Sequence, residues 1–474
     1  MSRLVVVSNR VALPGAGRQA GGLTVAVNAA LRKQPGIWFG WSGKVTDGDG
    51  APKPTIIESR GVTYIAQDLP RRDYEEYYQG FANSVLWPIL HYRVDLAEYT
   101  NADLSGYRRV NALFADQLAS FLRPDDMIWV HDYHLMTLAK ELRARGFQNR
   151  IGFFLHIPCP PPDILLTLPQ HAATLGALAD YDLVGFQTEN DADNFSAYLE
   201  SRGATRRGNR QLEFEGRRTA VEAFPVGIAT RVYARAARSS IRSRFAQDLR
   251  ASLGDQKLIL GVDRLDYSKG IIHRMQAYEA FLQHRPEWRE RVSFLQVTPK
   301  SREAVPGYKE MDEVVSGLVG QINGSYGEAS WTPLRYVNRS YTRRTLAGVY
   351  RIADVALVTP LRDGMNLVAK EYVAAQDPDD PGVLILSRFA GAAAELDGAV
   401  LVNPHETEAM VVAMRQALEM SLAERRERHA RMYARIEKYD IDWWAQQFLS
   451  RLAEAHGKPS LIGGLRNLLT TFTF

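Results

Sequence analysis

The sequence has a single cysteine, Cys159, among its 474 residues. One cysteine excludes a disulfide within the chain and a zinc site built from cysteine pairs. No apolar run approaches the roughly 20 residues that cross a bilayer, and the first one, Leu4–Val7, is too short for a signal peptide. These absences predict a soluble, cytoplasmic protein that does not enter a membrane.

The chain also lacks a strong excess of charge of either sign. Its 58 Lys and Arg residues against 54 Asp and Glu residues leave a net charge of +4. A dedicated nucleic-acid binder carries a dominant basic surface, so this class is excluded and no nucleic-acid partner is expected. By contrast, 46% apolar residues supply a large core, and the length predicts two or three domains at about 150 residues each.

Apolar strand-like runs alternate with segments of helical periodicity along the whole chain. Continuous β-branched runs joined by amphipathic helices indicate parallel sheets covered on both faces. Two such series predict an α/β protein with two doubly wound domains. The expected strands are Leu4–Val7, Met127–Val130, Ile151–Leu155, Leu183–Phe186, Leu258–Val262, Ser293–Val297, Val355–Val358, Gly382–Leu386 and Ala399–Val402.

The sequence between residues 226 and 256 suggests the boundary between the two series, because a charged helical segment there precedes the second one. We therefore predict an N-terminal domain over residues 1–236 and a C-terminal domain over residues 237–440. The remaining segment, 441–474, opens with Asp442-Trp443-Trp444. We expect it to form a helix that packs back toward the N-terminal domain, followed by a tail.

Glycines precede the first predicted helix, at positions 15, 17, 21 and 22. Backbone amides at the start of a helix can bind an anion, and glycine lets a phosphate approach them. The spacing is one residue too long for the dinucleotide fingerprint G-x-G-x-x-G. A nicotinamide-dependent oxidoreductase is therefore disfavoured, and plain turn chemistry stays an equal alternative for these glycines.

Two cations, Arg264 and Lys269, lie between a predicted strand and the helix that starts at Ile271. Fixed cations at the start of a helix suit a diphosphate group. The alternative is that Arg264 pairs with Asp263 or Asp266 inside the loop.

A third strand-to-helix junction spans Pro360–Glu371. Asp363 can accept hydrogen bonds from sugar hydroxyls, and Glu371 can bind both hydroxyls of a ribose. The alternative makes Asp363 a helix cap and Glu371 a solvated charge. Three junctions of this kind in one chain favour a nucleotide-sugar site.

Polar side chains follow two predicted strands of the first series, in His131-Asp132-Tyr133-His134 and at His156. Carboxyl ends of strands are where α/β proteins bind ligands. His131 and His134 could be metal ligands, but no neighbouring side chain completes a set, which favours structural histidines. The Asp-x-Asp pattern occurs five times and is therefore uninformative, so no metal and no cofactor is predicted.

Several long motifs together resemble the trehalose-6-phosphate synthase family. They cover nearly the whole chain in order: Ser8-Asn9-Arg10, Gly21-Gly22-Leu23, Trp38–Gly43, His131–His134, Phe153–Pro158, Asp263–Gly270 and Asp363–Glu371. The resemblance implies a GT-B fold, in which two Rossmann-like domains face each other across a deep cleft. It also implies retaining, metal-independent transfer of glucose from UDP-glucose to glucose 6-phosphate, the first step of trehalose biosynthesis.

The resemblance also implies a role for each matching residue. Four would be catalytic: Asp132, His156, Arg264 and Lys269. Glucose 6-phosphate would be bound by Arg10, Trp41, Tyr78, Trp87, Asp132 and Arg302, although core packing is the alternative for Tyr78 and Trp87. UDP-glucose would be bound by Gly21, Gly22, His156, Arg264, Lys269, Tyr341, Asp363, Gly364, Met365, Asn366, Leu367, Val368, Ala369, Lys370 and Glu371.

The family further implies a front-face reaction, a role in osmotic stress and a homo-oligomer, either a dimer or a tetramer. One departure is visible: Cys159 and Pro160–Pro162 follow His156-Ile157-Pro158, where the family usually has an aromatic residue. The alternatives are a glucosylglycerol-phosphate synthase, another sugar-phosphate glycosyltransferase, a pseudo-glycosyltransferase and an inactive nucleotide-sugar sensor. The base of the donor nucleotide is left open.

Overall fold

The chain forms two compact units in a computed structural model, which describes all residues except 1, 16–21, 49, 51, 300–305 and 456–474. The first unit contains the described residues up to Pro225 and those from Trp444 onward, and the second spans Val226–Trp443. The boundary expected after residue 236 falls inside helix α9 (Thr230–Ser240), which belongs entirely to the second unit. Helix α9 packs against other helices of that unit, and the buried Thr230 hydroxyl donates to the carbonyl of Ile436, 2.7 Å away.

The first unit is built on a sheet that has ten strands within the described residues. Its central strands β2, β1, β5, β6 and β7 are parallel, with antiparallel strands at both edges. Buried apolar runs such as Leu4–Val7 form these central strands because both faces of the sheet are covered. In sheet order the strands are β3 (Thr55–Ser59), β4 (Val62–Pro70), β2 (Gly36–Thr46), β1 (Leu4–Arg10), β5 (Met127–His131), β6 (Arg150–Phe154), β7 (Leu183–Phe186), β10 (Arg217–Ala223), β9 (Gln211–Phe214) and β8 (Thr205–Arg206).

The helices of the first unit begin at the residues their sequence favours. Thr100 and Thr188 cap α4 (Asn101–Ala119) and α8 (Glu189–Ser201) through side chains that accept backbone amides. A π-helix, η1 (Tyr74–Leu86), follows the short α2 (Arg71–Asp73). The others are α1 (Gly22–Lys33), α3 (Trp87–Leu90), η2 (Val94–Leu96), η3 (Tyr133–Leu135), α5 (Leu138–Ala144), α6 (Pro162–Leu165), α7 (His171–Thr174) and η4 (Gly176–Asp180).

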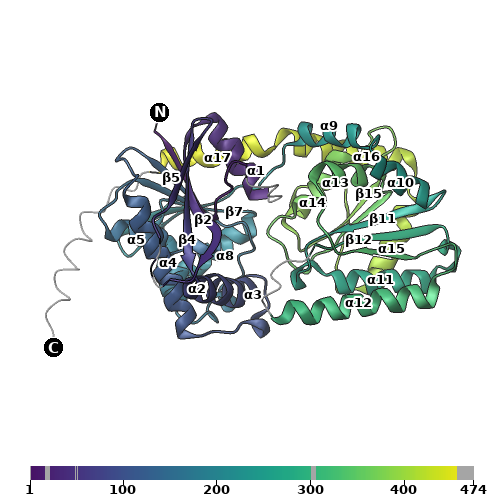
Figure 1. The fold of residues 1–474 in the computed structure, drawn as a ribbon, viewed down its shortest axis with the longest axis horizontal. Coiled ribbons are helices and arrows are strands. Elements are labelled where there is room, and N and C mark those ends of the chain that lie inside the picture. Colours follow the sequence, from purple (N-terminus) through teal and green to yellow (C-terminus); the bar gives the residue numbers. More distant parts are fainter. Residues whose placement is uncertain (1, 16–21, 49, 51, 300–305, 456–474) are drawn as a thin grey trace. The chain divides into compact units, whose positions relative to one another are not determined.

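The last described helix, α17 (Ile441–Glu454), completes the core of the first unit and is yellow in Figure 1. The fully buried Trp444 and Phe448 lie 5.0 and 4.8 Å, ring centre to ring centre, from the indole of Trp129 on β5. Gly152 and Gly185 leave room for Phe448, because a Cβ at either glycine would lie within 3 Å of its ring. The helix is therefore an integral part of this core.

The second unit contains a sheet whose six strands, among the described residues, are all parallel. Every residue of β14 is buried, as expected for a central parallel strand. In sheet order the strands are β13 (Leu334–Val337), β12 (Val292–Val297), β11 (Lys257–Val262), β14 (Val355–Val358), β15 (Val383–Ser387) and β16 (Val400–Val402).

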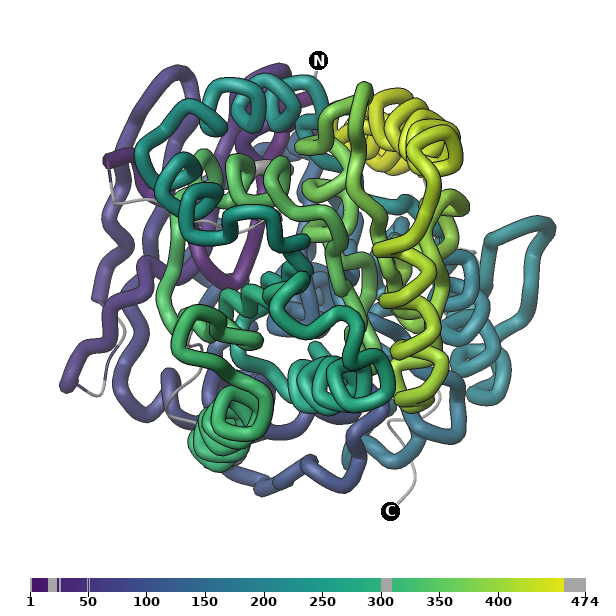
Figure 2. Tube along the Cα trace, turned by 90° about the vertical axis from the view of Figure 1, so that its right-hand side faces the viewer, coloured from purple at the N-terminus to yellow at the C-terminus, as the bar shows by residue number. Residues whose placement is uncertain are grey.

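Helices cover both faces of this second sheet. Figure 1 shows α9, α13, α14 and α16 on one face and α11, α12 and α15 on the other. Helices α11 and α12 lie side by side, as Figure 2 shows from a second direction. The helices of the second unit that follow α9 are α10 (Arg244–Leu253), η5 (Tyr267–Lys269), α11 (Ile271–His284), η6 (Pro286–Trp288), α12 (Pro306–Tyr326), α13 (Arg343–Ile352), α14 (Leu367–Ala375), η7 (Gly391–Ala394), α15 (Thr407–Glu419) and α16 (Leu422–Lys438).

The expected alternation of strands and helices is confirmed in the second unit and in the central part of the first, whereas β2–β4 and β8–β10 at the two edges of the first sheet follow one another without a helix between them. Within the described residues, no helix is both long and apolar enough to cross a bilayer.

Candidate active site

The second unit has a switch point between β11 and β14. These strands are neighbours in the sheet, while β12, which follows β11 in the chain, lies on its other side. The carboxyl ends of two such strands flank the position where doubly wound sheets bind ligands. The loops 263–270 and 359–366 start from these two ends.

A buried ion pair joins the two loops. The Arg274 guanidinium, which is fully buried, donates to the Asp263 carboxylate at 2.8 Å, to the Thr359 hydroxyl at 3.0 Å and to Gln296 at 3.1 Å. Gly270 lets the loops approach closely, because it has a φ of +64° and a Cβ there would lie 2.3 Å from the carbonyl oxygen of Thr359. The loop that carries the two predicted cations is thus fixed to the end of β14.

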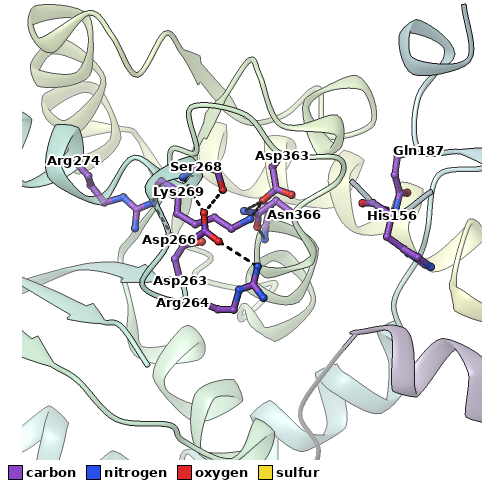
Figure 3. Close-up of polar contacts among 11 residues, drawn as sticks. His156, Gln187, Asp263, Arg264, Asp266, Ser268, Lys269, Arg274, Asp363 and Asn366 are labelled. Carbon is purple, nitrogen blue, oxygen red and sulfur yellow. Dashed lines mark hydrogen bonds and ion pairs between the residues drawn. The ribbon is translucent and has the colours of Figure 1, made fainter. Parts of the chain in front are cut away.

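Lys269 and Asp363 meet across this junction (Figure 3). The Lys269 ammonium lies 2.5 Å from Asp363 Oδ2, and the Asn366 amide donates to the same oxygen at 3.1 Å. Asp363 therefore holds an ammonium and an amide at the start of α14.

Arg264 takes the alternative arrangement from the sequence analysis, since its guanidinium lies 3.5 Å from Asp266 Oδ2. Asp266 itself is buried and caps the turn at Ser268. The Arg264 side chain is still 46% exposed, so its guanidinium is accessible to an anion.

Helix α14 begins at a left-handed cap. Asn366 has a φ of +76°, and its side-chain oxygen accepts the amide of Ala369 at 3.3 Å. The amides of Leu367 and Val368 precede the first intrahelical bonds and form the positive end of the helix dipole. Together with Arg264 and Lys269, this helix start suits an anionic group.

The side chain of Lys370 points away from this helix start. It is buried, pairs with Glu395 and donates to the carbonyl of Val226 at 2.8 Å. The neighbouring loop residue Met365 is also buried, and its carbonyl accepts the amide of Ala392. These contacts of Lys370 and Met365 fix the position of the segment Gly364–Lys370.

Glu371 lies half-buried on α14 and is not the solvated charge of the alternative interpretation. Burial raises the pKa of its carboxyl to about 7, against the opposing positive charge of Arg343. The Tyr233 hydroxyl lies 3.5 Å from Glu371 Oε2. Tyr233 and Arg343 were missed by the sequence analysis, because they come from α9 and α13 and no local pattern connects them to Glu371.

Tyr341 lies on the loop before α13, with its ring centre 5.1 Å from that of Phe245 on α10. The Arg339 guanidinium donates to the Tyr341 hydroxyl at 3.0 Å. These two contacts hold the Tyr341 ring on the loop between β13 and α13.

The first unit has its own switch point, between β1 and β5, and Arg10 and Trp41 lie near it. The Arg10 guanidinium lies 5.4 Å from the ring centre of Trp41. It also covers Gly43, where a Cβ would lie 2.1 Å from an Arg10 nitrogen. The exposed Arg10 therefore depends on a glycine that the sequence analysis did not assign a role.

The π-helix η1 brings Tyr78 to the same aromatic cluster. Its ring lies 5.4 Å from Trp41 and is stacked on His134 at 5.8 Å. Tyr74 stacks on Tyr78 at 5.6 Å and was missed, although the two tyrosines are four residues apart in the sequence. Trp87 is 4% exposed, the same fraction as Trp41, and its ring packs against His91 and Tyr133.

Asp132 connects the ends of β5 and β6 through a strained backbone. Its φ of +74° and ψ of 164° lie in a region that essentially only glycine occupies. Its amide donates to the carbonyl of Phe154 at 2.8 Å, and its carboxylate accepts the amide of His156 at 3.3 Å. Burial lowers the pKa of His156 to about 3, so its imidazole is neutral at physiological pH.

The loop after His156 is fixed despite its unusual sequence. The buried Cys159 donates its amide to Asp191 Oδ1 at 2.8 Å, and its carbonyl accepts from Asn194 at 2.8 Å. Helix α8 therefore holds the segment where the family usually has an aromatic residue.

Two predicted site residues, Gly21 and Arg302, lie outside the described residues, and Gly22 is the first residue of α1. Among the residues that the structure describes, no group of three or more histidine, cysteine, aspartate or glutamate side chains is placed to hold a metal ion.

Two doubly wound sheets of mostly parallel strands, the second with Arg264 and Lys269 at its switch point, have the architecture of a glycosyltransferase of the GT-B type. The chain belongs to glycosyltransferase family 20, whose model matches residues 12–454. This confirms the resemblance on which the sequence analysis relied.

Relatives match along nearly the whole chain. The trehalose-6-phosphate synthase of Sinorhizobium fredii is 51% identical over 457 residues, which cover 95% of this chain and 98% of the relative. The crystal structure of an α,α-trehalose-phosphate synthase (UDP-forming) from Burkholderia vietnamiensis is 48% identical, with a TM-score of 0.94 and coverage of 96% and 97%.

Two further solved structures hold ligands. A Burkholderia xenovorans α,α-trehalose-phosphate synthase in complex with glucose-6-phosphate is 45% identical, with a TM-score of 0.92 and coverage of 95% and 100%. An E. coli structure bound with UDP-2-fluoro glucose is 46% identical, with a TM-score of 0.92 and coverage of 96% and 100%.

The raised pKa of Glu371 gives a testable pH dependence. If the carboxylate accepts both ribose hydroxyls, binding selects its ionised form, so affinity rises as the pH passes through about 7. The dissociation constant for UDP-glucose, whose diphosphate does not titrate in this range, should fall about tenfold between pH 6 and pH 8. Calorimetric titration measures it. Glu371→Gln should bind more weakly with a flat profile, and an unchanged pH dependence in this variant would contradict the assignment.

Proposed function

We propose that this chain is a trehalose-6-phosphate synthase, which transfers glucose from UDP-glucose to glucose 6-phosphate with retention and releases UDP. The observation that carries the proposal is the Lys269–Asp363–Asn366 arrangement at the start of α14, with Arg264 beside it. Two relatives bound to glucose-6-phosphate and to UDP-2-fluoro glucose support both substrates.

The donor diphosphate binds at the carboxyl ends of β11 and β14. Arg264 and Lys269 supply two positive charges, and the amides of Leu367 and Val368 supply hydrogen-bond donors. Asp363 accepts from hydroxyls of the transferred glucose, Glu371 binds the ribose and Tyr341 lies at the uracil. Lys370 contributes through its backbone, because its side chain is paired with Glu395.

The acceptor binds at the carboxyl edge of the first unit. Arg10 pairs with the phosphate of glucose 6-phosphate, and Trp41 and Tyr78 present ring faces and edges to the sugar. Asp132 accepts a sugar hydroxyl from its strained position at the end of β5. Trp87, which packs against Tyr133 and is as little exposed as Trp41, belongs to the same set through the family resemblance, as does Arg302.

The chemical step breaks the bond between the glucose anomeric carbon and the diphosphate oxygen and forms a bond to the acceptor hydroxyl on the same face. The leaving diphosphate accepts the proton of that hydroxyl. Arg264 and Lys269 stabilise the charge that develops on the diphosphate, and His156 donates to a hydroxyl of the transferred glucose. The protein acts by positioning and by fixed charge.

The other expectations of the sequence analysis stay predictions. They are the metal-independent reaction, the cytoplasmic location, the homo-oligomeric state and the role in osmotic stress.

A substrate panel tests the function. UDP-, GDP- and ADP-glucose are each offered with glucose 6-phosphate and with glycerol 3-phosphate, and release of nucleoside diphosphate is measured. We expect release with UDP-glucose and glucose 6-phosphate, and the same rate after treatment with EDTA. Release only with glycerol 3-phosphate would establish the alternative acceptor, and no release with any glucose 6-phosphate pair would contradict the proposal. A large loss with EDTA would contradict only the metal-independent reaction.

The role of Arg264 predicts a large effect of its removal. Arg264→Ala should lower kcat/KM about 100-fold, because a single side chain that stabilises the charge developing in a transition state typically contributes a factor of this size. Arg431→Ala is the matched control, since it removes a half-exposed arginine on α16 of the same unit. Near-normal kcat/KM in a folded Arg264→Ala variant would show that Arg264 does not bind the leaving diphosphate.

A further inference from the structure

His131 is a buried histidine for which the proposed mechanism has no use. It ends β5, is fully buried, and its Nδ1 lies 3.1 Å from Nε2 of His156. We propose that His131 is a positioning residue that donates its Nδ1 hydrogen to His156 and thereby fixes His156 as the tautomer with a hydrogen on Nδ1. The role in turnover rests on the proposed function, whereas the proton assignment does not.

Both imidazoles are neutral in this environment. The His131 ring centre lies 4.5 Å from that of Trp129 and 6.4 Å from that of Trp444, and Phe154 lies 4.7 Å from His156. Burial in this aromatic shell lowers the pKa of both histidines, since it penalises the charged form. Two neutral rings at hydrogen-bond distance share a single hydrogen, so one nitrogen donates and the other accepts.

The far nitrogen of His131 decides which ring donates. Its Nε2 is buried and has no hydrogen-bond partner among the described residues. If His156 donated, His131 would have to carry its own hydrogen on Nε2, which would leave a buried N–H without an acceptor. If His131 donates from Nδ1, its Nε2 carries no hydrogen and is only an acceptor without a partner. Orphaned buried donors are the rarer case in proteins, so the second arrangement is favoured.

This arrangement prepares His156 for the reaction. With Nε2 accepting from His131, its hydrogen lies on Nδ1, and the Nδ1–H can donate to a hydroxyl of the transferred glucose. The backbone is held as well, because the His156 amide donates to Asp132 and its carbonyl accepts from Gln187 at 3.4 Å (Figure 3). A neutral donor also avoids placing a positive charge beside the anomeric carbon, which loses electron density as its bond to the diphosphate oxygen breaks.

Nuclear magnetic resonance of the chain labelled with ¹⁵N-histidine tests the tautomer directly. Losses of signals in His131→Leu and His156→Gln assign the two residues among the ten histidines. We expect a protonated Nδ1 and a bare Nε2 in both rings at neutral pH. A protonated Nε2 in His156 would overturn the proposal. Because this measurement needs no turnover, an inactive wild-type chain with the expected tautomer would reject the proposed function and leave the proton assignment standing.

Kinetics of matched variants test the consequence. His131→Leu removes the donor and should lower kcat on the order of tenfold, with KM for glucose 6-phosphate unchanged. His131→Asn places an amide donor near the Nδ1 position and should restore most of kcat. Trp129→Phe perturbs the same aromatic shell without touching a His156 nitrogen, so it should keep kcat even where it lowers the thermal midpoint. An equal loss of kcat in Trp129→Phe, or no recovery in His131→Asn, would show that His131 acts only by packing.

Discussion

The ion pair between Asp263 and Arg274 is the contact on which the proposed donor site depends. Arg274 is held at four acceptors, because Lys269 also offers its carbonyl, 3.2 Å away. Removing one partner of such a pair leaves an uncompensated buried charge, at a cost of about 3–5 kcal/mol. This pair, by tying the loop after β11 to Thr359 at the end of β14, sets where Lys269 meets Asp363 and where α14 begins.

The first unit reaches its geometry through backbone strain and tight packing. Asp132 keeps a conformation that costs about 1–3 kcal/mol, because the hydrogen bonds to Phe154 and His156 fix both of its sides. Gly43 allows Arg10 to lie against the backbone. The aromatic side chains of Trp129, Trp444 and Phe154 pack around His131 and His156 and exclude water from their imidazoles. Local strain and burial thus place polar groups that would otherwise be solvated.

Much of the fold could be predicted from the chain, because the strands are continuous apolar runs and the helices between them are amphipathic. The junction residues could be predicted too, since Arg264, Lys269, Asp363 and Glu371 lie within a few residues of a strand end. Non-local packing could not. The partners Tyr233 and Arg343 come from other helices, and the inward direction of Lys370 depends on Glu395. The π-helix that carries Tyr78 has no sequence pattern of its own, and the extent of the second unit depends on contacts of Thr230 with distant residues.

The central claim is that the chain joins two glucose units with both anomeric centres in the α configuration. The most direct measurement is ¹³C nuclear magnetic resonance of the product formed from UDP-glucose labelled at the anomeric carbon and unlabelled glucose 6-phosphate. The expected result is a disaccharide phosphate whose labelled carbon has the one-bond carbon–proton coupling of an α-glucoside. That carbon should also show a three-bond coupling to the anomeric proton of the second glucose unit, whose own proton–proton coupling should be the small one of an α configuration. A β linkage, a bond to any other hydroxyl, or release of UDP with only free glucose formed would contradict the account.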